Sequence, residues 1–467
     1  MGPESASARE RREAAVRAAV RDGLIGARHP VIGLLDVRGV RTAAAALRAA
    51  FEEVTAPGTE VLHAFAVKAA SLVPVLRLLA GEGLGCEVAS PGELALARAA
   101  GVAPGRTVLD SPAKTDAELR EALALGIAVN ADSRQELARL DALVRSAPTA
   151  SVLGVRVNPQ LGAGSIGAMS TATETSKFGV AMRDEGARAW LVRAFAERPW
   201  LTRMHAHVGS QGCPPELMAE GVRAAYELAE EVNRAVGGQQ VRTLDIGGGL
   251  PVNFASEEVT PTFREYARLL DVTVPALFDG RYGLVTEFGR SLLAKSGTVL
   301  ARVEYTKSAG GRRIAVTHAG AQVAARTVFA PAAWPLRVAA FDALGRPKEG
   351  APVPQDVAGP CCFAGDLVAA DRPLPLLEPG DHVALLDTGA YYFSNHFAYN
   401  SLPRPGVYGY ASAEGRTETF TDAPGESGEH PGGGPNVRFV PVRRPQSLGE
   451  LVEESGGSLA ADLSALR

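Results

Sequence analysis

The 467-residue chain has few cysteines, few aromatic residues and almost no excess of either charge. Its four cysteines, two of them adjacent, are too few and too poorly spaced for a disulfide framework, and they fit a reducing compartment. The 48 Lys and Arg residues against 52 Asp and Glu residues give a net charge of -4. No global attraction to nucleic acid or to an anionic membrane is therefore expected, and small molecules are the favoured partners.

Long uninterrupted apolar runs are also missing. The best candidate, residues 61–80, contains Lys68 and Arg77, whereas a spanning helix needs about 18 uncharged apolar residues. The N-terminus is rich in Arg and Glu and lacks the apolar segment of a secretory signal. We therefore expect a cytoplasmic protein that does not enter the membrane.

What is present is the composition of a globular protein, with 46% hydrophobic and 21% charged residues. Between residues 60 and 300, short apolar runs alternate with longer segments of helical period, which is the pattern of βα units. Strands are expected at 61–66, 107–109, 128–129, 151–157, 202–208, 241–246 and 282–286, and helices at 91–100, 115–125, 133–146 and 214–235. The number of repeats predicts an α/β fold closed as a (β/α)8 TIM-like barrel, with an open doubly wound sheet as the alternative.

Beyond residue 300 the pattern changes to a mostly β C-terminal domain, with strands expected at 312–316, 382–386 and 437–442. We predict an N-terminal segment (1–54) that packs with the β domain, a barrel at 55–300 and the β domain at 301–467. The Gly- and Pro-rich stretch 423–435 predicts a mobile loop, and residues 448–467 predict a closing helix interrupted by two glycines.

Polar residues at predicted strand ends are the candidate site, because barrel sites form at the carboxyl ends of the strands. Lys68 follows an apolar strand directly, so burial can lower the pKa of its amine and let it form an imine; alternatively it is an ordinary surface lysine. Gly247, Gly248 and Gly249 end another strand, where they can wrap a phosphate or simply make a tight turn.

Two further groups end strands of the predicted barrel. His205 and His207 would lie on one face of a strand, yet no further metal ligands accompany them, and we expect no metal site. Glu287 and Arg290 reach the same rim, where a plain structural ion pair is the alternative.

The ordered combination of motifs is far more specific than any single one. The chain contains, in order, AVKAA, CEVASPGEL, RVNP, SKFGV, HVGSQ, DIGGGL, EFGRS, GPCCFAGD and DTGAYYFSNHFAYNSLPRP. Over about residues 30–415 this series resembles the pyridoxal phosphate-dependent decarboxylases of diaminopimelate and ornithine, which have an alanine-racemase-like fold.

The resemblance implies pyridoxal 5'-phosphate as the cofactor and assigns roles to the site residues. Lys68 would carry the cofactor as a Schiff base, His207 would stack on its ring with His205 as a structural neighbour, and Glu287 would face the pyridine nitrogen. The remaining implied cofactor contacts are Glu87 near the ring histidine, Arg156 beside the ring, and a phosphate cradle of Ser210, Gly248, Gly249 and Tyr391, with Arg290 on the phosphate or the substrate carboxylate.

The resemblance also implies a reaction. A carboxylate at Glu287 keeps the ring nitrogen protonated, so the ring accepts the electron pair left by departing carbon dioxide and forms a quinonoid. Racemases of this fold typically have an arginine there. Cys362 would serve the protonation that follows, while Cys361 would be structural. In such enzymes the cysteine loop reaches into the partner's barrel, which implies a homodimer with shared active sites.

The chain departs from these relatives where the substrate side chain binds. Phe363 follows the cysteine where an acidic residue is usual, and Ala330 and Trp334 stand where an arginine and a tyrosine hold a distal carboxylate. An unpartnered buried charge costs several kcal/mol. We therefore predict a neutral, apolar or specialised biosynthetic amino acid as substrate, contacted by Arg290, Trp334, Phe363 and Tyr399.

Three alternatives remain open from the sequence. The first is a diaminopimelate decarboxylase whose specificity residues have moved, for example with Arg326 in the pocket. The second is a racemase. The third is a non-catalytic regulatory homologue, although such proteins usually lose the cofactor-holding residues that are retained here.

Overall fold

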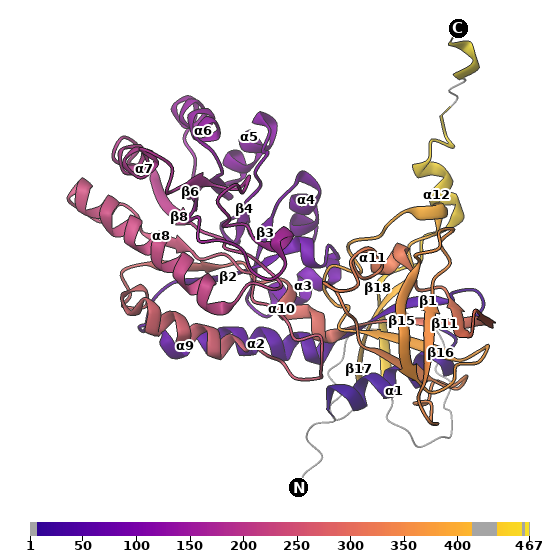
Figure 1. The fold of residues 1–467 in the computed structure, drawn as a ribbon. Coiled ribbons are helices and arrows are strands. Elements are labelled where there is room, and N and C mark those ends of the chain that lie inside the picture. The colour runs from indigo at the N-terminus through magenta and orange to yellow at the C-terminus, as the bar shows by residue number, and fades with distance from the viewer. Residues whose placement is uncertain (1–6, 413–436, 460–462, 467) are drawn as a thin grey trace. The chain divides into compact units, whose positions relative to one another are not determined.

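The computed structural model describes residues 7–412, 437–459 and 463–466, which divide into two units (Figure 1). The first unit comprises Gly39–Lys295 and Gly389–Ser394, and the second contains the other described residues. The mobile loop expected at 423–435 lies outside the described residues. Among the residues that the structure describes, no helix is long and apolar enough to cross a membrane.

The first unit is a closed barrel of eight parallel strands. Strand β5 pairs with β6 and β10 pairs with β2, so the ring of strands is complete. The eight strands are β2 (Val61–Ala66), β3 (Gly85–Val88), β4 (Thr107–Leu109), β5 (Ala128–Ala131), β6 (Leu153–Asn158), β8 (Leu201–His205), β9 (Thr243–Asp245) and β10 (Gly283–Thr286), and the short β7 (Val180–Ala181) is added beside β6. The prediction of a (β/α)8 barrel is confirmed, and the open sheet is excluded.

Helices lie outside these strands (Figure 1). They are α2 (Val37–Val54), α3 (Val73–Gly81), α4 (Pro91–Ala99), α5 (Asp116–Leu125), α6 (Arg134–Ser146), α7 (Ala187–Ala196), α8 (Pro215–Val236), α9 (Phe263–Thr273) and α10 (Arg290–Leu293). Local sequence sets several of their ends: α4, α5, α6 and α9 are each preceded by a hydroxyl group that accepts a hydrogen bond from a backbone amide in the first turn of the helix, and these residues are Ser90, Thr115, Ser133 and Thr262. Gly237, in the left-handed conformation, ends α8.

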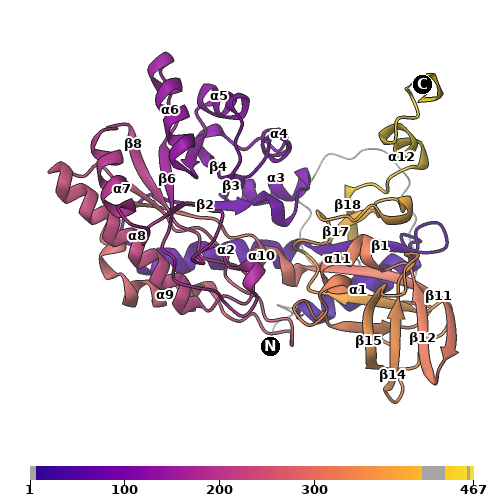
Figure 2. The same cartoon turned by 45° about the horizontal axis from the view of Figure 1, so that its top comes forward.

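The second unit is mostly β, as predicted. Its sheet runs β15-β14-β12-β11-β1-β17-β18, with β16 paired to both β11 and β13; strands β11, β12, β14 and β15 lie side by side in Figure 2. The strands are β1 (Val31–Asp36), β11 (Gly297–Ala309), β12 (Arg312–Thr317), β13 (Val338–Phe341), β14 (Val353–Ala358), β15 (Leu367–Leu374), β16 (His382–Leu386), β17 (Val407–Ser412) and β18 (Val437–Arg443). Its helices include α1 (Ala8–Arg21), α11 (Ala321–Phe329) and α12 (Leu448–Glu454).

The N-terminal residues supply part of this second core. Strand β1 pairs antiparallel with β11 and parallel with β17, so it is central in the sheet. Helix α1 buries Ala15, Val16 and Ala19 against Ile32 and Leu34 of β1. At the other end of the chain, α12 is shorter than predicted, because it ends at Glu454 just before the left-handed Gly456.

Candidate active site

Charged side chains from several strands meet at the carboxyl ends of the barrel strands, where barrel enzymes place their active sites. Lys68 lies in a single 3-10 turn (Val67–Ala69) directly after β2, and Glu87 lies in β3. Asp110 follows β4, His205 ends β8 and Glu287 follows β10. Parallel strands of one closed sheet bring these residues to the same rim.

Lys68 and Glu87 form an ion pair, with 2.8 Å between Nζ and Oε2. Burial alone would lower the pKa of Lys68, but the carboxylates of Glu87 and Glu287, together with Tyr391, raise that pKa above its ordinary value. The expectation that desolvation leaves a low-pKa amine is therefore wrong for this state of the site, because its neighbours favour the ammonium. Burial and the charges of Glu287 and Asp110 raise the pKa of Glu87 to about 8, against the attraction of Lys68.

Glu287 is almost fully buried and faces two histidines. Its Oε2 lies 3.4 Å from His205 Nε2 and 3.4 Å from His207 Nδ1. Its Oε1 is buried and accepts no hydrogen bond from any residue that the structure describes. Burial opposes the negative charge, yet the charge on His205 and hydrogen bonding to both histidines hold the pKa of Glu287 well below its usual range. The carboxylate is therefore ionised with one oxygen open to a donor.

The sequence suggested that the two histidines lie on the same face of one strand, and this expectation is wrong. Strand β8 ends at His205, so His207 lies in the following loop, and the two rings are 6.4 Å apart at 79°. Ligand atoms of His205, His207 and Glu287 do lie within 4.8 Å of one another. However, both ring nitrogens of His205 face carboxylates, which suits a doubly protonated ring and not a metal ligand.

Asp110 was missed by sequence reasoning. Its Oδ2 accepts a hydrogen bond from Arg156 Nη1 at 3.1 Å, and its Oδ1 lies 3.4 Å from His205 Nδ1. Arg156 also lies over the ring of Phe178, with 4.4 Å between guanidinium carbon and centroid. The only signal in the sequence was a polar residue directly after a short apolar strand, without a motif around it.

The triple-glycine turn after β9 packs against the loop of Glu287. The amide of Glu287 donates to Gly247 O at 2.7 Å, and a Cβ on Gly248 would lie 2.0 Å from the Glu287 carbonyl oxygen. Gly249 has φ +98°, and a Cβ there would lie 1.9 Å from Gly209 O, in the loop of Ser210. Only glycine fits this close approach. The turn therefore fixes the backbone of Glu287, which is a role independent of phosphate binding.

Residues from Gly389–Ser394 return to the backbone around Lys68. The amide of Tyr391 donates to Ala69 O at 2.7 Å, and the Ser394 hydroxyl donates to Lys68 O at 3.1 Å. The guanidinium carbon of Arg290 lies 4.4 Å from the centroid of the Tyr391 ring. The structure thus brings Tyr391 and Arg290 together, as expected. It also places Ser394 at the site, a residue of the same sequence motif as Tyr391 to which the sequence analysis gave no role.

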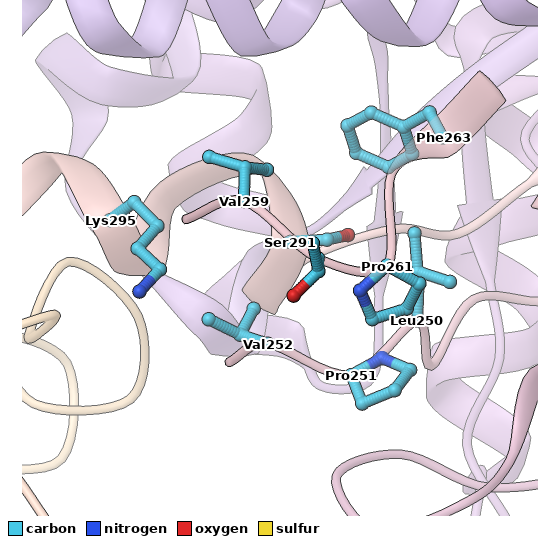
Figure 3. A pocket seen from close by; sticks show the side chains of 9 residues that line it. Leu250, Pro251, Val252, Val259, Pro261, Phe263, Ser291 and Lys295 are labelled. Atoms are coloured by element: carbon cyan, nitrogen blue, oxygen red, sulfur yellow. The ribbon is translucent and has the colours of Figure 1, made fainter. Parts of the chain in front are cut away.

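Behind the glycine turn is a small cavity of about 20 Å³, lined mostly by prolines and apolar side chains (Figure 3). The Ser291 hydroxyl lies among Pro251, Val252 and Pro261, and no described residue hydrogen-bonds to it. This volume holds about one water molecule. It is therefore too small for a cofactor or an amino acid.

The cysteine loop lies in the second unit and is anchored at both cysteines. Cys362 is exposed, and its amide donates to Asn400 Oδ1 at 2.8 Å. Cys361 is buried, and its amide donates to Asp366 Oδ2 at 2.6 Å. The other oxygen of Asp366 accepts the Ala321 amide at the start of α11. The backbone around the Cys362 thiol is therefore well defined.

Four aromatic rings lie beside Cys362, and we call Phe329, Phe363, Phe397 and Tyr399 the aromatic cluster. Phe363 stacks on Phe329 at 5.5 Å and 5°, and it meets Tyr399 edge-on at 5.3 Å. Tyr399 in turn stacks on Phe397. Of the predicted substrate contacts, Phe363 and Tyr399 are thus brought together.

The third predicted substrate contact in this unit, Trp334, has a different setting. It is 6% exposed, and the guanidinium carbon of Arg326 lies 5.0 Å from its ring centroid. Arg326 is therefore a cation held over an indole face, the type of arrangement that stabilises an arginine in a fixed place.

Two observations fit the pyridoxal phosphate that the resemblance implies. A lysine amine stands at a strand end with a carboxyl group 2.8 Å away that can take up its proton. A buried, ionised carboxylate keeps one oxygen open, and that oxygen suits a ring N–H donor. Lys68 and Glu287 would therefore hold the coenzyme's aldehyde and pyridine ends.

Comparisons with known proteins agree with this geometry. Residues 40–294 match the family described as "Pyridoxal-dependent decarboxylase, pyridoxal binding domain". The diaminopimelate decarboxylase of Methanothermobacter thermautotrophicus is 33% identical over 370 residues, which cover 77% of this chain and 83% of the relative. That of Pseudomonas aeruginosa is 35% identical over 353 residues, covering 74% and 80%.

Solved structures give the same result. The crystal structure of diaminopimelate decarboxylase from Helicobacter pylori complexed with L-lysine is 26% identical, with a TM-score of 0.76 over 94% of this chain and 100% of that chain. The chain therefore belongs to the family of pyridoxal phosphate-dependent amino-acid decarboxylases.

Proposed function

We propose that this chain removes the α-carboxylate of an amino acid as carbon dioxide, with Lys68 holding the coenzyme covalently. The observation that carries the proposal is the charge arrangement at the barrel rim. Lys68 is paired with a carboxyl group, and Glu287 is buried yet ionised. When bound, pyridoxal phosphate supplies an aldehyde that joins an amine and a ring that accepts electrons.

The chain's own residues prepare this reaction. Glu87 Oε2 lies 2.8 Å from Lys68 Nζ, so the Glu87 carboxylate can accept the proton that the Lys68 ammonium must lose before its amine attacks an aldehyde. Ionised Glu287 keeps a proton on a ring nitrogen placed against Oε1. His207, Arg156, Ser210, Gly248, Gly249, Tyr391 and Arg290 are the further proposed coenzyme contacts, and the exposed Cys362 thiol is the proposed proton donor to the substrate carbon.

We propose that the active unit is a homodimer in which the cysteine loop completes the partner's site. Phe329 is 60% exposed and Phe397 is 38% exposed, so the aromatic cluster presents apolar surface beside Cys362. Contiguous exposed apolar surface of this kind is typical of interaction sites.

Diaminopimelate is the first candidate substrate, because it is the substrate named for the relatives of 30–35% identity. Its distal ammonium and carboxylate need charged partners. Arg326, held over Trp334, supports this candidate as a relocated anchor for the distal carboxylate.

An amino acid with an uncharged side chain is the second candidate, and the aromatic cluster favours it. Phe363 stands directly after Cys362 and packs against the rings of Phe329 and Tyr399, so this position offers no carboxylate to an ammonium group. A specialised biosynthetic intermediate with an apolar side chain would fit such a surface.

Carbon dioxide release over a panel of diaminopimelate, ornithine and neutral L- and D-amino acids tests the reaction and chooses the substrate. Gas release from diaminopimelate supports the first candidate, and release from neutral amino acids alone supports the second. Interconversion of enantiomers without gas would contradict decarboxylation and indicate a racemase.

Two variants sharpen the choice between substrates. Arg326→Ala should lower diaminopimelate turnover about tenfold or more if that residue binds the distal carboxylate. Phe363→Glu should lower the turnover of a neutral substrate by a similar factor, because it places a charge beside an apolar side chain. The exposed Arg313→Ala on β12 is the matched control and should change neither rate.

The attachment site is tested without any substrate. Borohydride reduction of the holoenzyme, followed by peptide mass analysis, should place a pyridoxyl group on Lys68. The Lys68→Ala variant should carry no adduct. A pyridoxyl group on another lysine, or none on the wild type, would refute the proposed role of Lys68.

A further inference from the structure

His205 is fully buried between two carboxylates at the end of β8. Its Nδ1 lies 3.4 Å from Asp110 Oδ1, and its Nε2 lies 3.4 Å from Glu287 Oε2. The side chain has no solvent exposure. The resemblance gives this histidine no role beyond that of a structural neighbour.

Both ring nitrogens of His205 face carboxylate oxygens, and this arrangement favours a charged ring. In a neutral imidazole one nitrogen carries a lone pair, which here would face an anionic oxygen, whereas both nitrogens of an imidazolium are donors. Burial would lower the pKa of His205, but Asp110, Glu287 and Asp245 of the neighbouring strand ends together raise it well above its ordinary value. An imidazolium is therefore the form that suits both contacts.

Charges alternate along a line that ends at Glu287. Arg156 donates to Asp110 at 3.1 Å, Asp110 faces His205, and His205 faces Glu287. Asp110 has a second cation of its own in Arg156. Within the described residues, the ion-pair partners of Glu287 are His205 and the more exposed His207.

We propose that His205 is a positioning residue whose imidazolium keeps Glu287 ionised and turns its Oε1 toward the ring nitrogen of the coenzyme. This inference rests on the proposed placement of Glu287 against that nitrogen. Without His205, two buried carboxylates would face the same space, and such a pair retains a proton. A protonated Glu287 no longer holds the ring in its electron-accepting form.

The test measures binding of pyridoxal 5'-phosphate to the apoprotein, and the pH titration of the absorption spectrum of the bound coenzyme. It uses His205→Gln, Glu287→Gln and the double variant. We expect each single variant to weaken coenzyme binding about tenfold or more and to shift the spectral titration in the same direction. The double variant should be no worse than Glu287→Gln alone, because His205 acts through Glu287.

The matched control is His63→Gln, which removes another buried barrel histidine. His63 lies in β2, and its Nδ1 is 2.8 Å from Thr286 Oγ1, so the substitution perturbs packing without touching Glu287. It should leave coenzyme binding and the spectral titration unchanged. If His205→Gln does not fold, Asp110→Asn, which weakens the charge on His205, should shift the spectral titration in the same direction by a smaller amount.

Three outcomes would overturn the inference. Additive losses in the double variant would show that His205 acts independently of Glu287. An unchanged spectral titration in a folded His205→Gln protein would show that its role is only packing. If Glu287→Gln alone leaves the spectrum unchanged, the proposed placement of Glu287 itself fails, which is a separate result.

Discussion

At Lys68, burial and neighbouring charge act in opposite directions, and neighbouring charge dominates. Burial would release a proton from the ammonium, whereas Glu87, 2.8 Å away, retains it. The charge of this site is thus set by a partner from the adjacent strand. The reactivity of the lysine therefore depends on where the proton of the pair resides.

Replacing Glu87 with Gln should shift coenzyme attachment to lower pH. The substitution removes the carboxylate that does most to raise the pKa of Lys68, so the ammonium loses its proton more readily. The rate of absorbance change on mixing apoprotein with pyridoxal phosphate, measured against pH, should have a lower midpoint in the variant. The exposed Glu121→Gln is the control, and an unmoved midpoint in Glu87→Gln would contradict the importance of the pair.

The sequence predicts which residues reach the rim of the barrel better than it predicts their protonation states. Lys68 and Glu287 follow apolar strands, so their placement could be predicted, whereas His207 was expected inside the strand 202–208 and lies in the loop after β8. Asp110 lies in no recognisable motif. Its place in the site becomes evident only from its contacts with Arg156 and His205, which come from other strands of the barrel. The direction of the pKa shift at Lys68 depends on a contact with another strand, which periodicity does not reveal.

At the scale of elements, strand boundaries could be predicted because short apolar runs alternate with longer segments of helical period. Strand β4 and strand β16 have the predicted bounds, while β8 ends three residues earlier than expected, because the chain turns away after His205. Close packing between loops was not predictable. The approach of the glycine turn to Glu287 depends on two segments about 40 residues apart.

Gly248→Ala should weaken coenzyme binding about tenfold or more. The new Cβ would lie 2.0 Å from the Glu287 carbonyl oxygen, so the backbone of one loop must move, at a cost of about 1–3 kcal/mol. Binding titrations and thermal unfolding measure the two effects. Gly238→Ala, where no atom lies within 4 Å of the added Cβ, is the matched control. Equal behaviour of the two variants would contradict the packing role of the turn.

At the scale of the whole molecule, a buried histidine links stability to pH. Burial, with the charges of Arg48 and Arg106, lowers the pKa of His63 from 6.5 to about 4. In the unfolded chain the ring takes up a proton near pH 6.5, but the folded state resists it, so stability falls as pH decreases from 6.5 toward 4. Between pH 7.5 and 5 this loss is about 2 kcal/mol.

His63→Gln should therefore lose less stability than the wild type on acidification. Thermal or urea unfolding at pH 7.5 and pH 5 measures the difference, and the comparison cancels the titration of all other groups. The same pH dependence in both proteins would show that His63 is not the group responsible.

The proposed sharing of active sites in a homodimer makes a further prediction for the assembled protein. Lys68→Ala and Cys362→Ala should each be nearly inactive, but mixing and reassociating them should restore about one quarter of wild-type activity, because half of the dimers then contain one intact site. Lys68→Ala mixed with Glu287→Gln should restore nothing, since both changes lie in the barrel unit. Mixed dimers without recovered activity would contradict sharing of the cysteine loop.

The return of residues 389–394 to the Lys68 turn also bears on how the protein is made. Ser394 and the backbone oxygen that it contacts are 326 positions apart in sequence. Most of the chain must therefore leave the ribosome before the backbone contacts around Lys68 can form. We therefore expect the barrel to bind pyridoxal phosphate firmly only after residues 389–394 have been synthesised and have packed against the Lys68 turn.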